Sequence, residues 1–393
     1  MRRVYLDHNA TTPLDPRVVE VMQPYLSESF GNASSNHYHG RRAKQALEEA
    51  RALAARMIGA QPDEVIFTSG GTESDNSALR GIAYQKRRGH IIASSIEHHA
   101  VLRTCNALAG DGFTVTFLPV DSRGVVDPDE VRRSIRGDTI LISVMYANNE
   151  TGVIEPIPEI GLIAREHGIP FHCDAVQAMG KIPVDVDSLH ADLLSLSAHK
   201  IYGPKGTGAL FVKEGMTLSP LITGGHHEKG LRAGTENVPA IVGFARALEI
   251  AVDELDIYRT RVLHLRNLLE SKLLTGMEGV TLHSAGAERL PHTSCMGFAS
   301  VEAESILLHL DLKGIAASSG SACTTGEPEP SHVLTAMGVS PEIAQGTIRF
   351  SLGRQNTEEE IDYTGEVLKA EVNQLRAISF PWQAAGKRIS ITG

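Results

Sequence analysis

A lysine in the middle of the chain lies where it could act as an amine nucleophile. Lys200 follows the apolar run Leu193–Leu196 and precedes a turn rich in glycine and proline, so we expect it at the end of a buried strand. Burial disfavours the ammonium form, which lowers the amine pKa and prepares a lysine to form a Schiff base with an aldehyde cofactor. Asp174 ends another apolar run upstream, where a carboxylate suits the pyridinium nitrogen of pyridoxal phosphate. Taken alone, these two residues would more often form a surface ion pair.

Other polar residues follow predicted strands in the same way. Gly71 and Thr72 begin a helix after the strand Val65–Thr68, and a glycine-containing helix N-terminus can bind a phosphate. His98 follows the strand His90–Ser94, where an imidazole can stack on a flat ring and transfer protons. Each position has an ordinary alternative, since a plain helix cap and a structural histidine have the same sequence pattern.

Three further residues have side chains suited to a substrate or a cofactor ring. Asn149 follows an apolar run, and its amide suits a carboxylate or a ring oxygen, although turn chemistry also explains asparagine there. Gln177 lies shortly after Asp174 and could donate to the same ring oxygen. Arg349 lies on the polar side of an alternating strand, so it either grips an α-carboxylate or is solvated.

One cysteine lies in a segment unlike those of the others. Cys323 belongs to the stretch 318–332, which is small, polar and broken by glycine and proline, and is therefore expected to be an exposed loop. An accessible thiol is a candidate nucleophile, with an incidental surface thiol as the alternative. Cys105, Cys173 and Cys295 lie in apolar periodic segments and are predicted to be in the core.

Composition narrows the functional classes. The chain has 393 residues, of which 42% are hydrophobic and 21% charged, with a net charge of −10 that argues against nucleic acid and anionic membranes as partners. Four widely spaced cysteines, without zinc spacing, predict no metal site and favour a reducing cytoplasm over a disulfide framework. We expect no signal peptide and no membrane span.

Strand and helix patterns alternate through the first part of the chain. This βαβ alternation predicts an α/β fold with a mainly parallel sheet whose strand ends hold the ligand. The segment 238–274 is helical, as two helices or one bent helix, and beyond it we expect a smaller α+β module onto which the N-terminal strand returns. The predicted strands of the sheet are 65–68, 90–94, 115–119, 140–145, 170–173, 193–196 and 209–212.

Taken in order, the motifs closely resemble those of the pyridoxal-phosphate cysteine desulfurases of the NifS/IscS class, within the class-V aminotransferase family. The resemblance covers residues from about 4 to 376. The long segment around Cys323 is similar to the NifS/IscS branch rather than to the short-loop Suf-type branch. The matching motifs are Tyr5–Pro13, Phe30–Ser35, Thr68–Ser74, Glu97-His98, Asn148–Gly152, Asp174–Gln177, His199-Lys200, Gly224–His226, Arg232–Asn237, Ser318–Cys323 and Arg349–Leu352.

The resemblance implies an aspartate aminotransferase-like fold (PLP-dependent fold type I) and a cytoplasmic homodimer. A large domain, 15–256, would hold a seven-stranded sheet, and a small domain, 1–14 with 257–393, would carry the loop of Cys323. The cofactor would be pyridoxal 5'-phosphate, held as a Schiff base on Lys200. The implied cofactor-binding residues are Gly71, Thr72, His98, Asn149, Asp174, Gln177, Ser197, His199, Lys200 and, from the other subunit, Thr235.

The resemblance also implies the reaction. Lys200 and His98 would transfer protons, Asn149 and Arg349 would bind the carboxylate of L-cysteine, and Cys323 would take the sulfur as a persulfide and leave L-alanine. The sulfur would pass to an iron–sulfur scaffold protein or another acceptor, but the tail 378–393 matches no family pattern and leaves the acceptor open. A selenocysteine lyase, a small-molecule aminotransferase and a non-enzymatic scaffold are the alternatives.

Overall fold

The computed structural model describes residues 2–319 and 331–378. Cys323, the predicted nucleophile, lies outside the described residues, as do most residues of its predicted loop and of the C-terminal tail. Within the described residues, no helix combines the length and the apolar character needed to cross a membrane.

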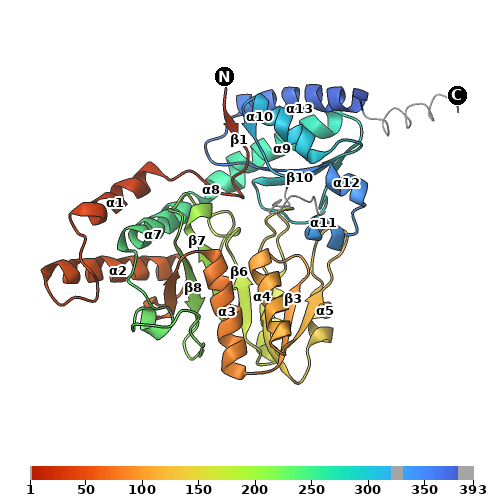
Figure 1. Ribbon diagram of the computed structural model, residues 1–393. Helices are drawn as coiled ribbons and strands as arrows, with labels where there is room; N and C mark the ends of the chain where they lie inside the picture. The colour runs from red at the N-terminus through yellow and green to blue at the C-terminus, as the bar shows by residue number, and fades with distance from the viewer. Residues whose placement is uncertain (1, 320–330, 379–393) are drawn as a thin grey trace, which may run out of the picture.

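A seven-stranded sheet forms the centre of the larger part of the molecule (Figure 1). The strand order is β2-β8-β7-β6-β5-β3-β4, and the neighbours from β7 to β4 are parallel. Strand β8 runs antiparallel to both of its neighbours. The prediction of a mainly parallel sheet of seven strands is confirmed. The strands are β2 (Val65–Thr68), β3 (His90–Ser94), β4 (Thr114–Leu118), β5 (Thr139–Ser143), β6 (Phe171–Asp174), β7 (Leu193–Ser197) and β8 (Gly208–Val212).

Helices cover both faces of this sheet, as parallel strands require when both faces must be buried. Apolar residues of α3 and α4 form one core with the sheet, and those of α2, α6 and α7 form a larger core on the opposite face. The helices of this part are α1 (Pro16–Ser27), α2 (Tyr38–Met57), α3 (Gly71–Lys86), α4 (His99–Gly110), α5 (Pro128–Ser134), α6 (Ile157–Glu166) and α7 (Val238–Asp253), with the 3-10 turns η1 (Pro62–Glu64), η2 (Ala198–Lys200) and η3 (Glu228–Gly230).

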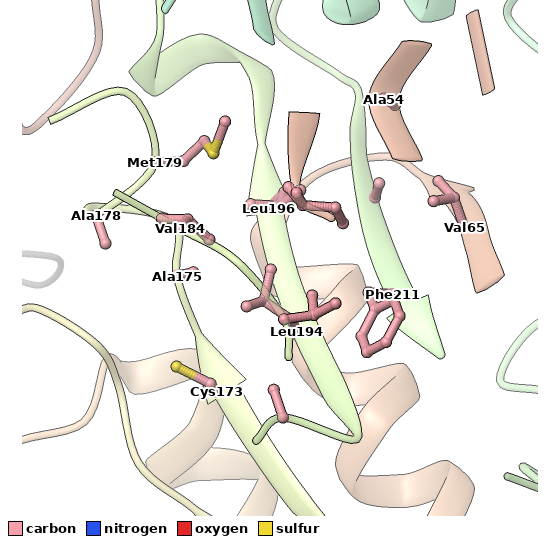
Figure 2. Packing of buried hydrophobic residues seen from close by; sticks show 14 of the residues in the cluster. Ala54, Val65, Cys173, Ala175, Ala178, Met179, Val184, Leu194, Leu196 and Phe211 are labelled. Carbon is pink, nitrogen blue, oxygen red and sulfur yellow. The ribbon is translucent and has the colours of Figure 1, made fainter. Parts of the chain in front are cut away.

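Side-chain alternation along β6 and β7 divides apolar from polar residues. Leu194, Leu196 and Phe211 lie together in the larger core (Figure 2). Because successive side chains of a strand point to opposite faces, Ser195 and its cross-strand neighbour Asp174 lie toward α3 instead. The strand pattern therefore directs the Asp174 carboxylate to the face where the cavity described below opens.

A second part of the molecule contains a three-stranded antiparallel sheet, β12-β10-β9, and a separate core. The N-terminal strand pairs in parallel with β11, with Val4 opposite Ile315, so the expected return of this strand is confirmed. The helical stretch 238–274 is broken, as expected, between α7 and α9. The division into domains at residue 256 stays a prediction. The elements are β1 (Val4–Tyr5), α8 (Leu255–Ile257), the π-helical turn η4 (Tyr258–Val262), α9 (Leu263–Gly276), β9 (Val280–Leu282), β10 (Thr293–Phe298), α10 (Ala303–Leu312), β11 (Ile315–Ala316), α11 (His332–Ala336), α12 (Pro341–Gln345), β12 (Thr347–Ser351) and α13 (Glu358–Ile378).

A buried ion pair ties α2 to the turn η3. Arg51 Nη2 donates to Glu228 Oε1 at 2.7 Å, and Glu228 Oε2 accepts from the backbone N–H of Phe67 at 2.8 Å. Replacing Glu228 by glutamine removes the only buried carboxylate paired with Arg51 among the described residues and leaves the exposed Glu48, at 3.2 Å from Nε, as its counter-charge. We therefore expect urea denaturation to show a loss of about 3–5 kcal/mol in the free energy of unfolding. The matched control is Glu130→Gln, which breaks an exposed pair with Arg133 and should cost less than about 1 kcal/mol. Equal losses in the two variants would contradict this prediction.

Candidate active site

A cavity of about 360 Å³ lies where strand ends of the large sheet meet the second part of the chain. Every predicted site residue that the structure describes, apart from Thr235, lines it. Thr235 is exposed and is not part of the lining. Its contact with the cofactor of a second subunit stays a prediction. The lining residues are Asn9, Ala10, Gly71, Thr72, Asp75, His98, Met145, Asn149, Asp174, Val176, Gln177, Ser197, His199, Lys200, Ser318 and Arg349.

The Lys200 amine is held by backbone carbonyls of the N-terminal segment. Lys200 is the last residue of η2, directly after β7, so the strand end sets the position of its Cα. Its Nζ donates to the carbonyl oxygens of Asn9 at 2.5 Å and Ala10 at 2.8 Å. Burial, together with the Arg349 charge, lowers the pKa of the Lys200 ammonium from 10.5 to about 8. The amine is therefore far more often neutral near physiological pH than a solvated lysine.

This lowered pKa predicts how the cofactor-free protein should capture an aldehyde. Only the neutral amine is a nucleophile, and its fraction rises with pH until it levels off above the folded-state pKa of about 8. We expect the capture rate for pyridoxal phosphate to rise about tenfold per pH unit below 8 and to level off above it, followed by stopped-flow absorbance between pH 6 and 10. A rate that continues to rise to pH 10 would show an unshifted amine.

Two buried carboxylates lie side by side in the lining. Burial raises the pKa of Asp75 well above its usual range, and the charge of Asp174 adds to the effect. Burial also raises the pKa of Asp174, but a 2.9 Å hydrogen bond from Val176 N and the charge of Lys200 favour its ionised form. Since two adjacent buried carboxylates do not both ionise, Asp75 keeps the proton and Asp174 carries the charge.

The start of α3 forms one wall of the cavity. Gly71 and Thr72 are its first residues, where backbone N–H groups have no partner within the helix. A Cβ on Gly71 would lie 2.8 Å from Val176 Cγ2, so glycine allows the backbone of α3 to lie this close to Val176. The hydroxyl of Ser197 and the imidazole of His199 line the same wall, and the His199 ring contacts Thr11 Oγ1 at 3.1 Å. Together with the helix N-terminus, these groups can donate hydrogen bonds to an anionic group.

His98 is positioned as the N-cap of α4. Its Nδ1 accepts from the backbone N–H of Ala100 at 3.1 Å, so in the neutral ring the other nitrogen, Nε2, carries the proton. Burial and the Lys200 charge lower the pKa of His98 to about 4, which keeps the imidazole neutral at physiological pH. Next to it, Glu97 is buried and accepts from Ser94 Oγ at 2.6 Å and from Met145 N at 2.8 Å, which fixes the chain before the histidine.

Arg349 enters the cavity from β12, in the second part of the molecule. It is 5% exposed, so the alternative of a solvated arginine is excluded. Nη1 donates to the carbonyl oxygen of Asn149 at 2.9 Å, and Nη2 donates to Asp7 Oδ1 at 2.8 Å. Its buried Nε has no hydrogen-bond partner among the described residues. A guanidinium held in this way keeps a donor for a small carboxylate.

The sequence reasoning missed several lining residues. Asn9 and Ala10 belong to the motif Tyr5–Pro13, but an N-terminal segment carries no local sign of what it will contact. Asp75, Met145, Val176 and Ser318 were also missed. Asp75 could have been found, since an acidic residue among buried helix positions is unusual. The predicted burial of Cys105, Cys173 and Cys295 is confirmed.

The family model for class-V aminotransferases matches residues 4–364, nearly the whole chain. The chain belongs to the class-V aminotransferase family. It is 52% identical over 380 residues to a cysteine desulfurase IscS of Dictyoglomus turgidum, with 96% of each chain covered. It is also 52% identical over 380 residues to a cysteine desulfurase IscS of Methanosarcina thermophila, which covers 96% of this chain and 94% of the relative.

A solved structure of a NifS-like protein has the same fold, with a TM-score of 0.89 and 42% identity over 95% of this chain and all of that one. A NifS-like protein from Rickettsia africae gives a TM-score of 0.86 at 35% identity, over 95% of this chain and 100% of the other. The predicted membership and the predicted fold are therefore confirmed.

The class-V family binds pyridoxal 5'-phosphate, and the residues of the cavity fit it. The Lys200 amine suits the aldehyde of the cofactor, and the ionised Asp174 suits its ring nitrogen. The N-terminus of α3, where Gly71 has no side chain to block a close approach, suits its phosphate. His98 and Gln177 line the same cavity and can contact the ring.

Proposed function

We propose that the chain is a cysteine desulfurase that removes sulfur from L-cysteine and leaves L-alanine. The observation that carries the proposal is the single cavity shared by a lysine amine of lowered pKa, a buried carboxylate pair and an arginine with a free donor. This set suits an α-amino acid bound to pyridoxal phosphate. The names and the extent of the similar IscS proteins support cysteine as that amino acid.

Residues of the cavity have separate roles in this reaction. Arg349 holds the substrate carboxylate, and Asn149 is placed beside it through the hydrogen bond from Arg349. Lys200 takes a proton from the substrate's α-carbon and later returns one, which its pKa of about 8 permits near neutral pH. His98 is neutral because its pKa is about 4, and it takes up the proton of the substrate thiol at Nδ1, which then releases its hydrogen bond from the Ala100 N–H. The cofactor supplies an electron sink that stabilises negative charge at the α-carbon.

The sulfur leaves through a thiol of the chain. The Cys323 thiolate attacks the sulfur of the substrate, a sulfur–sulfur bond forms, and the carbon–sulfur bond breaks with its electron pair staying on carbon. That carbon gains a proton and becomes the methyl group of alanine, while Cys323 holds a persulfide. A protein acceptor, such as an iron–sulfur scaffold, then takes the sulfur.

We also propose a cytoplasmic homodimer in which Thr235 of one subunit contacts the cofactor phosphate of the other. The exposure of Thr235 and the similarity to NifS-like proteins support this arrangement. The division into a large domain, 15–256, and a small domain, 1–14 with 257–393, belongs to the same proposal.

The test is a reaction of the purified protein, loaded with pyridoxal phosphate, with L-cysteine and a reductant. We expect alanine and sulfide in equal amounts, and without reductant one sulfur atom added to the protein, mapped to Cys323 by mass spectrometry. Transfer of the amino group to a 2-oxo acid, without alanine from cysteine, would identify an aminotransferase. Release of selenium from selenocysteine, without release of sulfur from cysteine, would identify a selenocysteine lyase.

A further inference from the structure

A second buried lysine contacts the turn that carries Lys200. Lys181 follows Asp174 in the loop after β6, is 3% exposed and does not line the cavity. Its Nζ donates to the backbone carbonyl oxygen of Lys200 at 3.2 Å. The loop that directly follows Asp174 therefore also holds the main chain of the proposed nucleophile.

The surroundings of Lys181 are polar or aromatic but supply no counter-charge. Its Nζ lies 4.4 Å from the centre of the Tyr258 ring and 5.9 Å from that of Tyr202. Within residues 2–319 and 331–378, no carboxylate lies within 4.0 Å of this nitrogen, and the Lys200 carbonyl is its one hydrogen-bond acceptor. The nearby His292 is fully buried, and neither of its ring nitrogens has a partner among the described residues.

An ammonium in such a place costs stability. Burial, with the charges of Arg354 and Lys200 acting in the same direction, lowers the pKa of Lys181 to about 7. A methionine of similar volume would fill the space without burying a charge, and buried charges replaced by apolar side chains often leave a protein as stable or more so. The contact made by Lys181 must therefore serve something other than stability.

The backbone around Lys200 is held from several sides. Thr12 donates from its Oγ1 to the His199 carbonyl oxygen at 2.9 Å, and the same Oγ1 accepts from Tyr202 N at 2.7 Å. Tyr202 has a φ of +63°, a left-handed conformation that a non-glycine residue keeps only where its surroundings enforce it. The carbonyl of Lys200 lies between these points, and Lys181 is the group that binds it.

We propose that Lys181 is a positioning residue, which fixes the Lys200 carbonyl and thereby the direction in which the Lys200 amine enters the cavity. With both ends held, by Lys181 at the carbonyl and by Asn9 and Ala10 at the amine, Lys200 has little freedom left to lose during the reaction. The kinetic consequences rest on the proposed function, whereas the restraint on the Lys200 amine does not.

The test compares three variants. Lys181→Met removes the donor and keeps the volume, Lys181→Gln keeps an uncharged donor, and Ile201→Val loosens packing beside the same turn without touching the contact. In the cofactor-free full chain, we measure unfolding midpoints against pH and the acetylation rate of Lys200, by peptide mass spectrometry with the half-exposed Lys213 as internal reference. In the loaded enzyme we measure kcat and KM for cysteine.

We expect Lys181→Met to unfold no more readily than the wild type, with its advantage largest below pH 7. The pKa of Lys181 is depressed in the folded state, so the unfolded chain binds more protons between about pH 7 and 10.5, and the wild type gains stability as pH rises through that range. Acetylation of Lys200 should be roughly five- to tenfold faster in this variant, and kcat roughly tenfold lower with KM within about twofold. Lys181→Gln should bring the acetylation rate and kcat part of the way back to the wild-type values. Ile201→Val should lower the unfolding midpoint and leave the acetylation rate and kcat within about twofold of wild type.

A Lys181→Met variant that is less stable than the wild type, or fails to fold, would mark Lys181 as a structural residue and overturn the proposal. Unchanged acetylation of Lys200, or a glutamine variant that behaves like the methionine variant, would overturn it as well. Unfolding and acetylation are measured without any enzymatic reaction. A wild-type protein that forms no alanine from cysteine would therefore contradict the proposed function, while these two measurements would still test the role of Lys181.

Discussion

Replacing Lys200 by alanine is expected to abolish alanine formation from cysteine, with a loss on the order of 10⁴-fold or more. The amine is the only lysine nitrogen lining the cavity among the described residues. Borohydride reduction, which fixes pyridoxal phosphate on the wild-type chain, should fix none on the variant. Both results are read from the same preparation, by alanine analysis and by peptide mass spectrometry.

The control for this variant is another lysine of the same part of the chain. Lys213 is half-exposed and pairs with Asp192 on the surface, so Lys213→Ala should keep its activity and its borohydride-fixed cofactor. The Lys200 variant should also remain folded, since it removes a buried charge rather than an apolar contact. Cofactor fixed to a different lysine in Lys200→Ala would contradict the assignment.

Much of the site could be predicted because parallel strands bring their carboxyl ends to one edge. Each of four site residues lies at or just beyond the end of a strand: His98 after β3, Asn149 after β5, Asp174 at the end of β6 and Lys200 after β7. These strands are neighbours in the sheet and all run in the same direction. Four residues scattered over a hundred positions therefore meet in one cavity, and a strand pattern read along the chain is enough to expect this.

The remaining lining residues depend on contacts that leave no local pattern. Asn9 and Lys200 are joined by a hydrogen bond across 191 positions, and no periodicity near the N-terminus foretells it. Arg349 was a candidate on chemistry alone, since its strand belongs to a different sheet. Lys181 was missed for a physical reason: a lysine is expected at the surface, and only the folded chain shows that this one is buried against Tyr258.

Replacing Cys323 by alanine should stop the reaction at a later point than the loss of Lys200. The variant keeps every described cavity residue, so it should bind pyridoxal phosphate on Lys200 with the wild-type absorbance. Without the thiol, nothing takes the substrate's sulfur, so we expect alanine formation to fall on the order of 10³-fold or more and no sulfur to be added to the protein. Amino-acid analysis and intact mass spectrometry after brief exposure to cysteine measure the two effects.

Cys105→Ala provides the matched control, because burial raises the pKa of Cys105 to about 12 and makes that thiol unreactive at neutral pH. This control should lose some stability through the cavity it leaves, yet form alanine and gain one sulfur like the wild type. If Cys323→Ala also formed alanine at the wild-type rate, sulfur would leave without a persulfide at Cys323, and the cavity alone would account for the chemistry. Cofactor binding with loss of sulfur transfer would instead separate the two halves of the mechanism, the cavity that weakens the carbon–sulfur bond and the thiol that receives the sulfur.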